Sequence, residues 1–217
     1  SIELANKNYH VVIIGRNEKG LNETSKLIKN NKKKCSLISL DVSKNIFIEK
    51  IKKKISNIDG NVELVINNAG LGVFDKIENI KKEDWDNQIA VNLTSAFLLV
   101  QAYIKEMKKN KKGILIFINS VAGKKGYPFS SAYVASKFAL RGFANSIREE
   151  LREFNIKVIS IFPGAIDTPF WDNVDVDYPK KEMMTSKEVA FAISNTINKN
   201  GVGVIEELVI RRNKGDF

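Results

Sequence analysis

The chain has 217 residues, one cysteine, one histidine and a formal net charge of +10, and 43% of its residues are hydrophobic. Cys35 alone excludes an intrachain disulfide framework, His10 alone excludes a catalytic scheme that needs two histidines, and no apolar run approaches the roughly 18 residues of a membrane span. The charge lies in short lysine clusters, mostly at the ends of predicted helices, where cations meet the negative end of the helix dipole; this argues against a nucleic-acid partner.

The predicted elements alternate between strands and helices along the chain. In chain order they are a strand at 11–14, a helix at 18–31, a strand at 35–40, a helix at 44–58, a strand at 64–66, a helix at 82–110 broken near Asn92, a strand at 114–118, a helix at 131–153, a strand at 158–162, a helix at 186–199 and a strand at 204–210. Residues 169–185 show little periodicity and predict a loop or lid over the site.

Each predicted strand is a nearly continuous apolar run. Strands of this kind are buried on both faces, which indicates a parallel sheet with helices on each side. Right-handed crossovers then give a doubly wound, Rossmann-like α/β sheet. We predict that residues 1–217 form one domain.

The beginning of the chain departs from the usual start of such a sheet. A dinucleotide-binding sheet opens with a strand and a glycine-rich turn, whereas residues 1–5 have the pattern of a helix end and no G-x-G-x-x-G occurs. We expect that this chain lacks the first strand and the phosphate loop. The alternative is that the protein never had them and binds no dinucleotide.

Tyr133 and Lys137 are four residues apart in a predicted helix, so they share one face of it. The reference pKa of tyrosine is about 10, and an ammonium beside the phenol is expected to lower that pKa. A tyrosine tuned in this way can exchange a proton with a reacting oxygen near neutral pH. The alternative is a lysine that merely packs along the tyrosine ring.

Further polar residues end the predicted strands at one edge of the sheet, where a parallel sheet forms its ligand crevice. They are Asp41, Asn67 to Gly70, Ser120, and Pro163 and Gly164 followed by Thr168. Three of these residues, and Asn92, have a purely structural alternative: Ser120 could bond only backbone, Asp41 could be the N-cap of the next helix, Thr168 could cap a turn, and Asn92 could cap or kink its helix. Phe170 and Trp171 could form a substrate wall or pack only on their own loop.

The combination of N-N-A-G at 67–70, Asn92, Ser120, Y-x-x-x-K at 133–137 and P-G-x-x-x-T at 163–168 resembles the short-chain dehydrogenase/reductase family. Order and spacing agree over essentially the whole chain, although the family's T-G-x-x-x-G-x-G loop is absent. The resemblance implies an oxidoreductase that transfers a hydride between a nicotinamide cofactor and a carbonyl or secondary alcohol, such as a carbonyl reductase.

The resemblance also implies a role for each matching residue. Tyr133 would be the acid/base, Ser120 would hold the substrate oxygen, Lys137 would bind the ribose hydroxyls and lower the pKa of Tyr133, and Asn92 would hold a water that links Lys137 to solvent. The cofactor would be contacted by Asp41 and Val42 at the adenine, by Asn68, Ala69 and Gly70, and by Pro163, Gly164, Ile166 and Thr168 toward the nicotinamide.

Arg16 favours NADP(H) over NAD(H). It directly follows a predicted strand end where the chain meets the adenosine ribose, and the first carboxylate after that strand is Glu18. An arginine there can pair bidentately with a 2′-phosphate, whereas a carboxylate would bind the 2′-hydroxyl instead. The alternative is that Arg16 is a solvated side chain or stacks on adenine whatever the phosphate.

We expect a small-molecule carbonyl substrate, no metal at the site, no nucleic-acid or membrane partner, and a cytoplasmic location. The family resemblance implies a homodimer or homotetramer that pairs through the helices at 93–110 and 131–153. The alternative function is a regulatory protein that binds the cofactor on the same fold and has lost catalysis. The intact Ser120, Tyr133 and Lys137 argue against that alternative.

Overall fold

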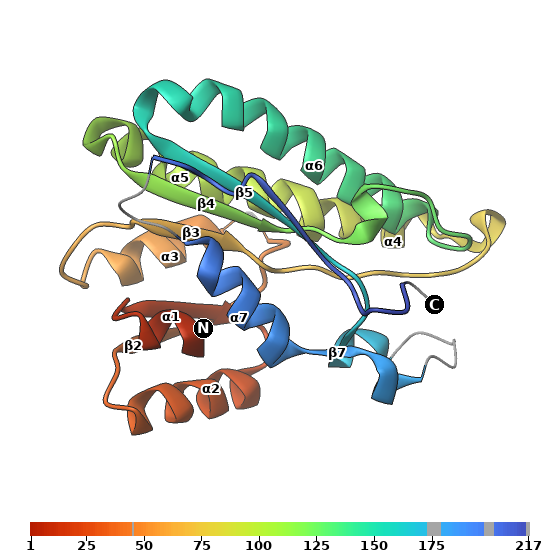
Figure 1. Ribbon diagram of the computed structural model, residues 1–217, viewed down its shortest axis with the longest axis horizontal. Coiled ribbons are helices and arrows are strands. Elements are labelled where there is room, and N and C mark those ends of the chain that lie inside the picture. The colour runs from red at the N-terminus through yellow and green to blue at the C-terminus, as the bar shows by residue number, and fades with distance from the viewer. Residues whose placement is uncertain (45, 173–178, 198–201, 216–217) are drawn as a thin grey trace. The chain divides into compact units, whose positions relative to one another are not determined.

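The computed structural model describes residues 1–44, 46–172, 179–197 and 202–215, and the chain divides into two compact units (Figure 1). The first unit spans Ser1–Asn61 and the second spans Val62–Phe217. The single domain expected over residues 1–217 stays a prediction.

The first unit is built on two parallel strands, β1 (Val11–Gly15) and β2 (Cys35–Ser39), which pair in register from Val11 with Cys35 to Gly15 with Ser39. Its helices are α1 (Ile2–Asn6), α2 (Glu18–Asn30) and α3 (Phe47–Ile55). The Asn17 side chain caps α2 by accepting a hydrogen bond from the Gly20 amide at 3.1 Å, which satisfies one of the free donors at the helix start.

The second unit contains a four-stranded parallel sheet in the order β3-β4-β5-β8. Its strands are β3 (Leu64–Asn67), β4 (Gly113–Ile118), β5 (Ile156–Pro163) and β8 (Glu207–Ile210). Nearly every residue of the two central strands is buried, as their continuous apolar runs predict. The parallel pairing expected from the sequence is therefore confirmed in both units.

Helices cover both faces of this sheet, which is what makes it doubly wound (Figure 1). The helix α5 (Ser95–Asn110) and the long helix α6 (Ser131–Leu151) lie on one face. The helix α7 (Ser186–Thr196) lies on the other, where Ile193 packs on a buried cluster of β4 and β5 isoleucines. Within the described residues, no helix is both long and apolar enough to cross a bilayer.

The predicted break near Asn92 is confirmed. The helix α4 (Lys82–Ile89) runs into a π-helical turn at Ala90–Thr94 before α5 begins. A π turn adds one residue to the helical repeat and is frequently found at functional sites. Asn92 lies inside this turn and is 1% exposed.

The prediction of an irregular loop over 169–185 is wrong in part. Short strands β6 (Ile166–Asp167) and β7 (Met184–Thr185) pair in parallel, and short 3₁₀ turns occupy Pro169–Trp171 and Lys180–Glu182. Strands of two residues are too short to show a periodic pattern, so the sequence alone does not reveal them. Residues 173–178 of this segment, and 198 and 199 of the predicted helix, lie outside the described residues.

Candidate active site

Tyr133 and Lys137 lie on one face of α6 in the second unit, as their spacing predicts. The Lys137 Nζ is 5.6 Å from the centre of the Tyr133 ring and donates a hydrogen bond to the Ile118 carbonyl at 3.0 Å. Ile118 is the last residue of β4. This bond therefore holds the ammonium, which is on a side chain only 3% exposed, at the carboxyl end of the sheet.

Burial determines the protonation of both groups. It raises the pKa of Tyr133 to about 12, although a hydrogen bond with Ser120 offsets part of this rise. It lowers the pKa of Lys137 to about 8. The expectation that the lysine lowers the tyrosine pKa is therefore wrong in this structure, because desolvation of the phenolate outweighs the favourable contacts. At neutral pH the phenol keeps its proton and is equipped to donate it.

Ser120 lies just beyond β4. The neighbouring Asn119 connects it to α6, the helix that carries Tyr133 and Lys137. The Asn119 side chain accepts a hydrogen bond from the Ser120 amide at 2.8 Å and donates one to the Lys137 carbonyl at 3.1 Å. The Ser120 Oγ accepts a hydrogen bond from the Ala122 amide at 3.1 Å. Ser120 therefore also bonds backbone, as its structural alternative predicts. A Cβ at Gly123 would approach to 2.3 Å of the Asn119 Oδ1, so this close packing requires glycine.

The Asn92 side chain joins the loop after β3 to α6. It accepts a hydrogen bond from the Leu71 amide, donates to the Leu71 carbonyl, and donates to the Ser136 Oγ, each at 2.9 Å. Ser136 in turn donates to the Tyr133 carbonyl at 2.7 Å. Asn92 is thus both a residue of the helix break and a support for Tyr133; its role in holding a water stays a prediction.

Asn68, Ala69 and Gly70 are exposed, and Gly70 lies close to the buried Lys137 ammonium. A Cβ built on Gly70 would lie 3.5 Å from the Lys137 Nζ and 3.6 Å from the Asn92 Oδ1. A side chain at this position would therefore come into van der Waals contact with the ammonium and with Asn92, whereas glycine adds no atom there.

The predicted residues after β5 lie at the end of that strand. Pro163 is its last residue, and the Gly164 amide donates to the Ile210 carbonyl at 2.8 Å. Ile166 belongs to β6 and accepts at its carbonyl from the Trp171 indole at 2.9 Å. Thr168 precedes the 3₁₀ turn without a capping bond from its side chain, so the structure does not support its alternative as a turn cap.

Arg16, Asp41 and Val42 lie in the first unit. Arg16 is exposed and follows β1, whereas Asp41 follows β2 by two residues. The alternative of Asp41 as a helix N-cap is wrong, because it accepts instead from the Ser43 amide at 2.9 Å and α3 begins at Phe47. This hydrogen bond, assisted by the charges of Arg16 and Lys44, holds the pKa of Asp41 below its usual value.

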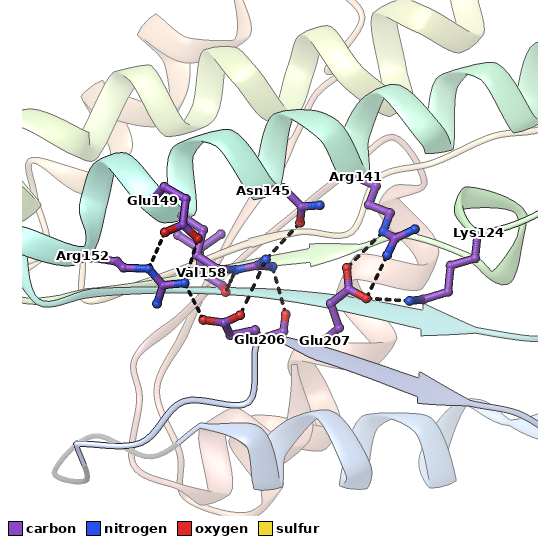
Figure 2. A network of polar contacts seen from close by, with 9 residues as sticks. Lys124, Arg141, Asn145, Glu149, Arg152, Val158, Glu206 and Glu207 are labelled. Carbon is purple, nitrogen blue, oxygen red and sulfur yellow. Dashed lines mark hydrogen bonds and ion pairs between the residues drawn. The ribbon is translucent and has the colours of Figure 1, made fainter.

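A cluster of charges ties the Ser120 turn and α6 to β8 (Figure 2). Glu207 accepts hydrogen bonds from Arg141 at 3.0 and 3.2 Å and from Lys124 at 2.5 Å. Arg141 follows Lys137 by one helical turn, and Lys124 ends the turn that Ser120 begins. Partial burial raises the pKa of Glu207, but the bonds from Lys124 and Arg141 outweigh it and hold that pKa below its usual value.

We expect the substitution Glu207→Gln to lower the free energy of unfolding by about 1 kcal/mol, because it leaves two partly buried cations without their counter-charge. Since the pKa of Glu207 is lowered in the folded chain, this contribution is present near neutral pH and is lost as pH falls through the acidic range. Urea unfolding measures it. The control is Glu149→Gln, whose carboxylate pairs with Arg152 but is 67% exposed; equal stability of the two variants would contradict the prediction.

Asn119, Ser136 and Glu207 support the site but were not predicted from the sequence. Glu207 bonds Lys124 and Arg141, which lie 83 and 66 residues away along the chain, and Ser136 bonds Asn92, 44 residues away. Spacing alone therefore gives no signal for Glu207 or Ser136. Asn119 offers a weak one, since a polar residue directly after an apolar strand lies at the sheet edge that forms ligand sites.

Comparison with known proteins identifies similar chains. A family model described as short chain dehydrogenase matches residues 1–179. The sepiapterin reductase of Chlorobaculum tepidum is 32% identical over 180 residues, which cover 83% of this chain and 73% of that protein. The 3-oxoacyl-acyl-carrier-protein reductase of Buchnera aphidicola is 35% identical over 211 residues, which cover 90% of this chain and 84% of that protein.

Two solved structures share the fold. The alcohol dehydrogenase of the archaeon Thermococcus sibiricus, complexed with 5-hydroxy-NADP, has a TM-score of 0.86 and 26% identity, and the match covers 97% of this chain and 89% of that one. A metagenomic short-chain oxidoreductase in complex with NADP has a TM-score of 0.79 and 28% identity, with the same two coverages. These similarities confirm the expected Rossmann-like α/β fold class.

Proposed function

Because the chain belongs to the short-chain dehydrogenase family, a family of oxidoreductases, we propose that it is an NADP(H)-dependent carbonyl reductase in which Tyr133 donates a proton to the substrate oxygen. The observation that carries this proposal is the half-buried Tyr133 on α6, with Ser120 bonded to it and the Lys137 ammonium 5.6 Å from its ring. The NADP-type ligands of the two similar solved structures support the choice of cofactor.

The residues of the second unit fit a nicotinamide nucleotide. Lys137 offers an ammonium next to Gly70, which would suit a pair of ribose hydroxyls. The exposed main chain of residues 68–70 would line the nucleotide, and Pro163, Gly164, Ile166 and Thr168 would meet the nicotinamide end. In the first unit, Arg16 would meet the 2′-phosphate, and Asp41 and Val42 the adenine. When bound, the cofactor supplies the hydride.

The chain itself handles the substrate oxygen and its proton. Ser120 would donate a hydrogen bond to the carbonyl oxygen and hold it near the phenol, which raises the electrophilicity of the carbonyl carbon. As negative charge develops on that oxygen, Tyr133 gives up its proton to form the alcohol. The resulting phenolate is stabilised by the Ser120 hydroxyl and by the ammonium of Lys137, and it regains a proton from solvent before the next turnover.

The test is NADPH oxidation by the purified chain with a panel of aldehydes and ketones. The proposal predicts oxidation that depends on the carbonyl compound and follows saturation kinetics. Tight NADPH binding without turnover of any carbonyl would instead favour a regulatory protein with lost catalysis. A chain that binds neither NADPH nor NADH would contradict both functions.

The substitution Arg16→Asp is expected to raise the KM for NADPH by about 10- to 100-fold, because it replaces a charge-assisted partner of the 2′-phosphate with a like charge. The KM for NADH should stay the same or fall. Steady-state kinetics with both cofactors measure this, with Lys26→Asp, an equal charge change on an exposed residue of α2, as the control. An unchanged KM for NADPH in Arg16→Asp would overturn the assignment.

Assembly and location remain predictions within this proposal. A homodimer or homotetramer through the helices at 93–110 and 131–153 is supported by Phe97 on α5 and Phe138 on α6, each 43% exposed. Exposed rings on two helices of one sheet face are typical of surfaces that associate. The cytoplasmic location, the small-molecule substrate and the lack of a nucleic-acid partner also stay predictions.

A further inference from the structure

The Tyr133 ring belongs to a cluster of four aromatic rings that come from three separate segments of the second unit. The ring of Phe74, which follows β3, lies 5.5 Å from the Tyr133 ring, and the ring of Phe170 lies 5.7 Å from it. Phe74 and Phe170 meet edge to face at 5.9 Å, Trp171 stacks on Phe74 at 6.3 Å and 14°, and Phe170 meets Trp171 at 5.3 Å. Phe74, Phe170 and Trp171, the three rings around Tyr133, are called the aromatic wall below.

The aromatic wall is held in place from several sides. A Cβ at Gly72 would approach to 2.7 Å of the Phe74 ring and 2.9 Å of the Phe170 ring, so only glycine allows this packing. The neighbours of Phe74 are anchored as well: the Val73 amide donates to the buried Gln88 at 3.1 Å, and the Asp75 amide donates to the Phe129 carbonyl at 2.9 Å. The indole of Trp171 is oriented by its bond to the Ile166 carbonyl.

The aromatic wall keeps part of its surface exposed. Its three side chains are half-buried, whereas core rings of the same unit, such as Phe117 and Phe162, are fully buried. The exposed part of these rings offers the apolar body of a substrate a surface to pack on, next to the Tyr133 ring.

The charges near the aromatic wall do not select a charged substrate. The ammonium of Lys137 contacts the Tyr133 ring but is bound to the Ile118 carbonyl. The carboxylate of Asp75, next to Phe74 in the chain, accepts from the Lys76 amide at 2.7 Å and from the Asn79 side chain at 3.0 Å. A substrate body that lies on these rings therefore gains from apolar and ring contacts rather than from ion pairs.

We propose that the substrate is an uncharged aryl ketone or aldehyde, whose aromatic ring packs on Phe74, Phe170 and Trp171 while its carbonyl reaches Tyr133. This inference rests on the proposed carbonyl reduction and specifies its substrate class. Offset and edge-to-face ring pairs gain free energy beyond that of the area they bury, which corresponds to about two- to tenfold in affinity for each pair. Saturated rings of the same size bury similar area but lack this gain.

The test compares acetophenone with cyclohexyl methyl ketone, which has the same carbonyl and a saturated ring. With NADPH as the reductant, we expect kcat/KM for acetophenone to be about tenfold higher. The substitution Phe74→Leu should bring this ratio close to one, and Phe74→Tyr should preserve it. The control Phe191→Leu removes a ring that is 60% exposed on α7 and should leave the ratio unchanged.

A binding measurement separates this inference from the proposed function. The chain has two tryptophans, Trp85 and Trp171, so the variant Trp85→Phe leaves Trp171 as the sole source of tryptophan emission. We expect acetophenone to quench that emission saturably in the presence of NADP⁺, and the Phe74→Leu substitution to weaken the quenching. Saturable quenching without turnover would support the aromatic site and contradict carbonyl reduction.

Three other results would contradict the proposed substrate class or the role of the aromatic wall. If both ketones are reduced with equal kcat/KM, the aromatic substrate class is wrong while carbonyl reduction stands. If a ratio near ten survives in Phe74→Leu, the aromatic wall is not what selects the substrate. If acetophenone neither turns over nor quenches Trp171, the inference is overturned whatever other carbonyl compounds the enzyme reduces.

Discussion

The substitution Tyr133→Phe is expected to lower kcat for carbonyl reduction by about 10²- to 10⁴-fold, the usual contribution of a general acid. The change removes one oxygen and keeps the ring that packs against Phe74 and Phe170. NADPH binding should therefore change by no more than about twofold, since only the interaction that serves proton transfer is lost. Steady-state rates and fluorescence titration with NADPH measure the two effects.

The matched control is Tyr103→Phe. Tyr103 lies on α5, is 7% exposed, and burial raises the pKa of its phenol to about 12, as it does at Tyr133. The control therefore removes a phenol whose pKa is raised in the same direction, away from the proposed site, and should retain kcat. A Tyr133→Phe variant that keeps the activity of this control would exclude Tyr133 as the proton donor.

The substitution Lys137→Met should abolish most activity while it stabilises the fold. Burial lowers the pKa of Lys137 from 10.5 to about 8, a shift that corresponds to a cost of about 3 kcal/mol for the charged form at neutral pH. Methionine fills similar space without the charge, but it leaves the Ile118 carbonyl without its donor, a loss of about 1 kcal/mol. We expect a net gain of about 1 to 2 kcal/mol in urea unfolding, together with a large rise in the KM for NADPH.

The pH dependence of stability provides a second measure of the same lysine. Because its pKa is lower in the folded chain, the unfolded chain binds more protons between about pH 8 and 10.5. The free energy of unfolding therefore includes a contribution that rises with pH across this range. This rise should disappear in Lys137→Met. A variant that is less stable than wild type at neutral pH, with the same dependence on pH, would contradict the proposed cost of burying the ammonium.

The fold follows from patterns that are local in the chain. The apolar runs of β4 and β5 predict buried parallel strands, and the interrupted helical pattern near Asn92 predicts the break that the structure shows as a π turn. The strands β6 and β7 were missed because two residues carry no periodicity. Pairing of such short strands depends on neighbours far away in the sequence, which pattern reasoning does not include.

The candidate site was predictable where spacing or strand ends determine position. The i,i+4 spacing places Tyr133 and Lys137 on one face, and the end of β4 places Ser120 nearby. The direction of the Tyr133 pKa shift was predicted wrongly, because it depends on how deeply the phenol is buried and spacing does not give that. Supporting bonds such as that from Asn92 to Ser136, 44 residues apart, also require the tertiary structure.

The most direct test of the central claim is a crystal structure of the chain with NADP⁺ and acetophenone bound. The account predicts that the Tyr133 Oη lies within hydrogen-bond distance of the ketone oxygen, about 2.6 to 3.2 Å, and that the Lys137 Nζ bonds the ribose hydroxyls beside Gly70. A nicotinamide ring bound elsewhere, with neither group in reach of the ketone or the ribose, would contradict it.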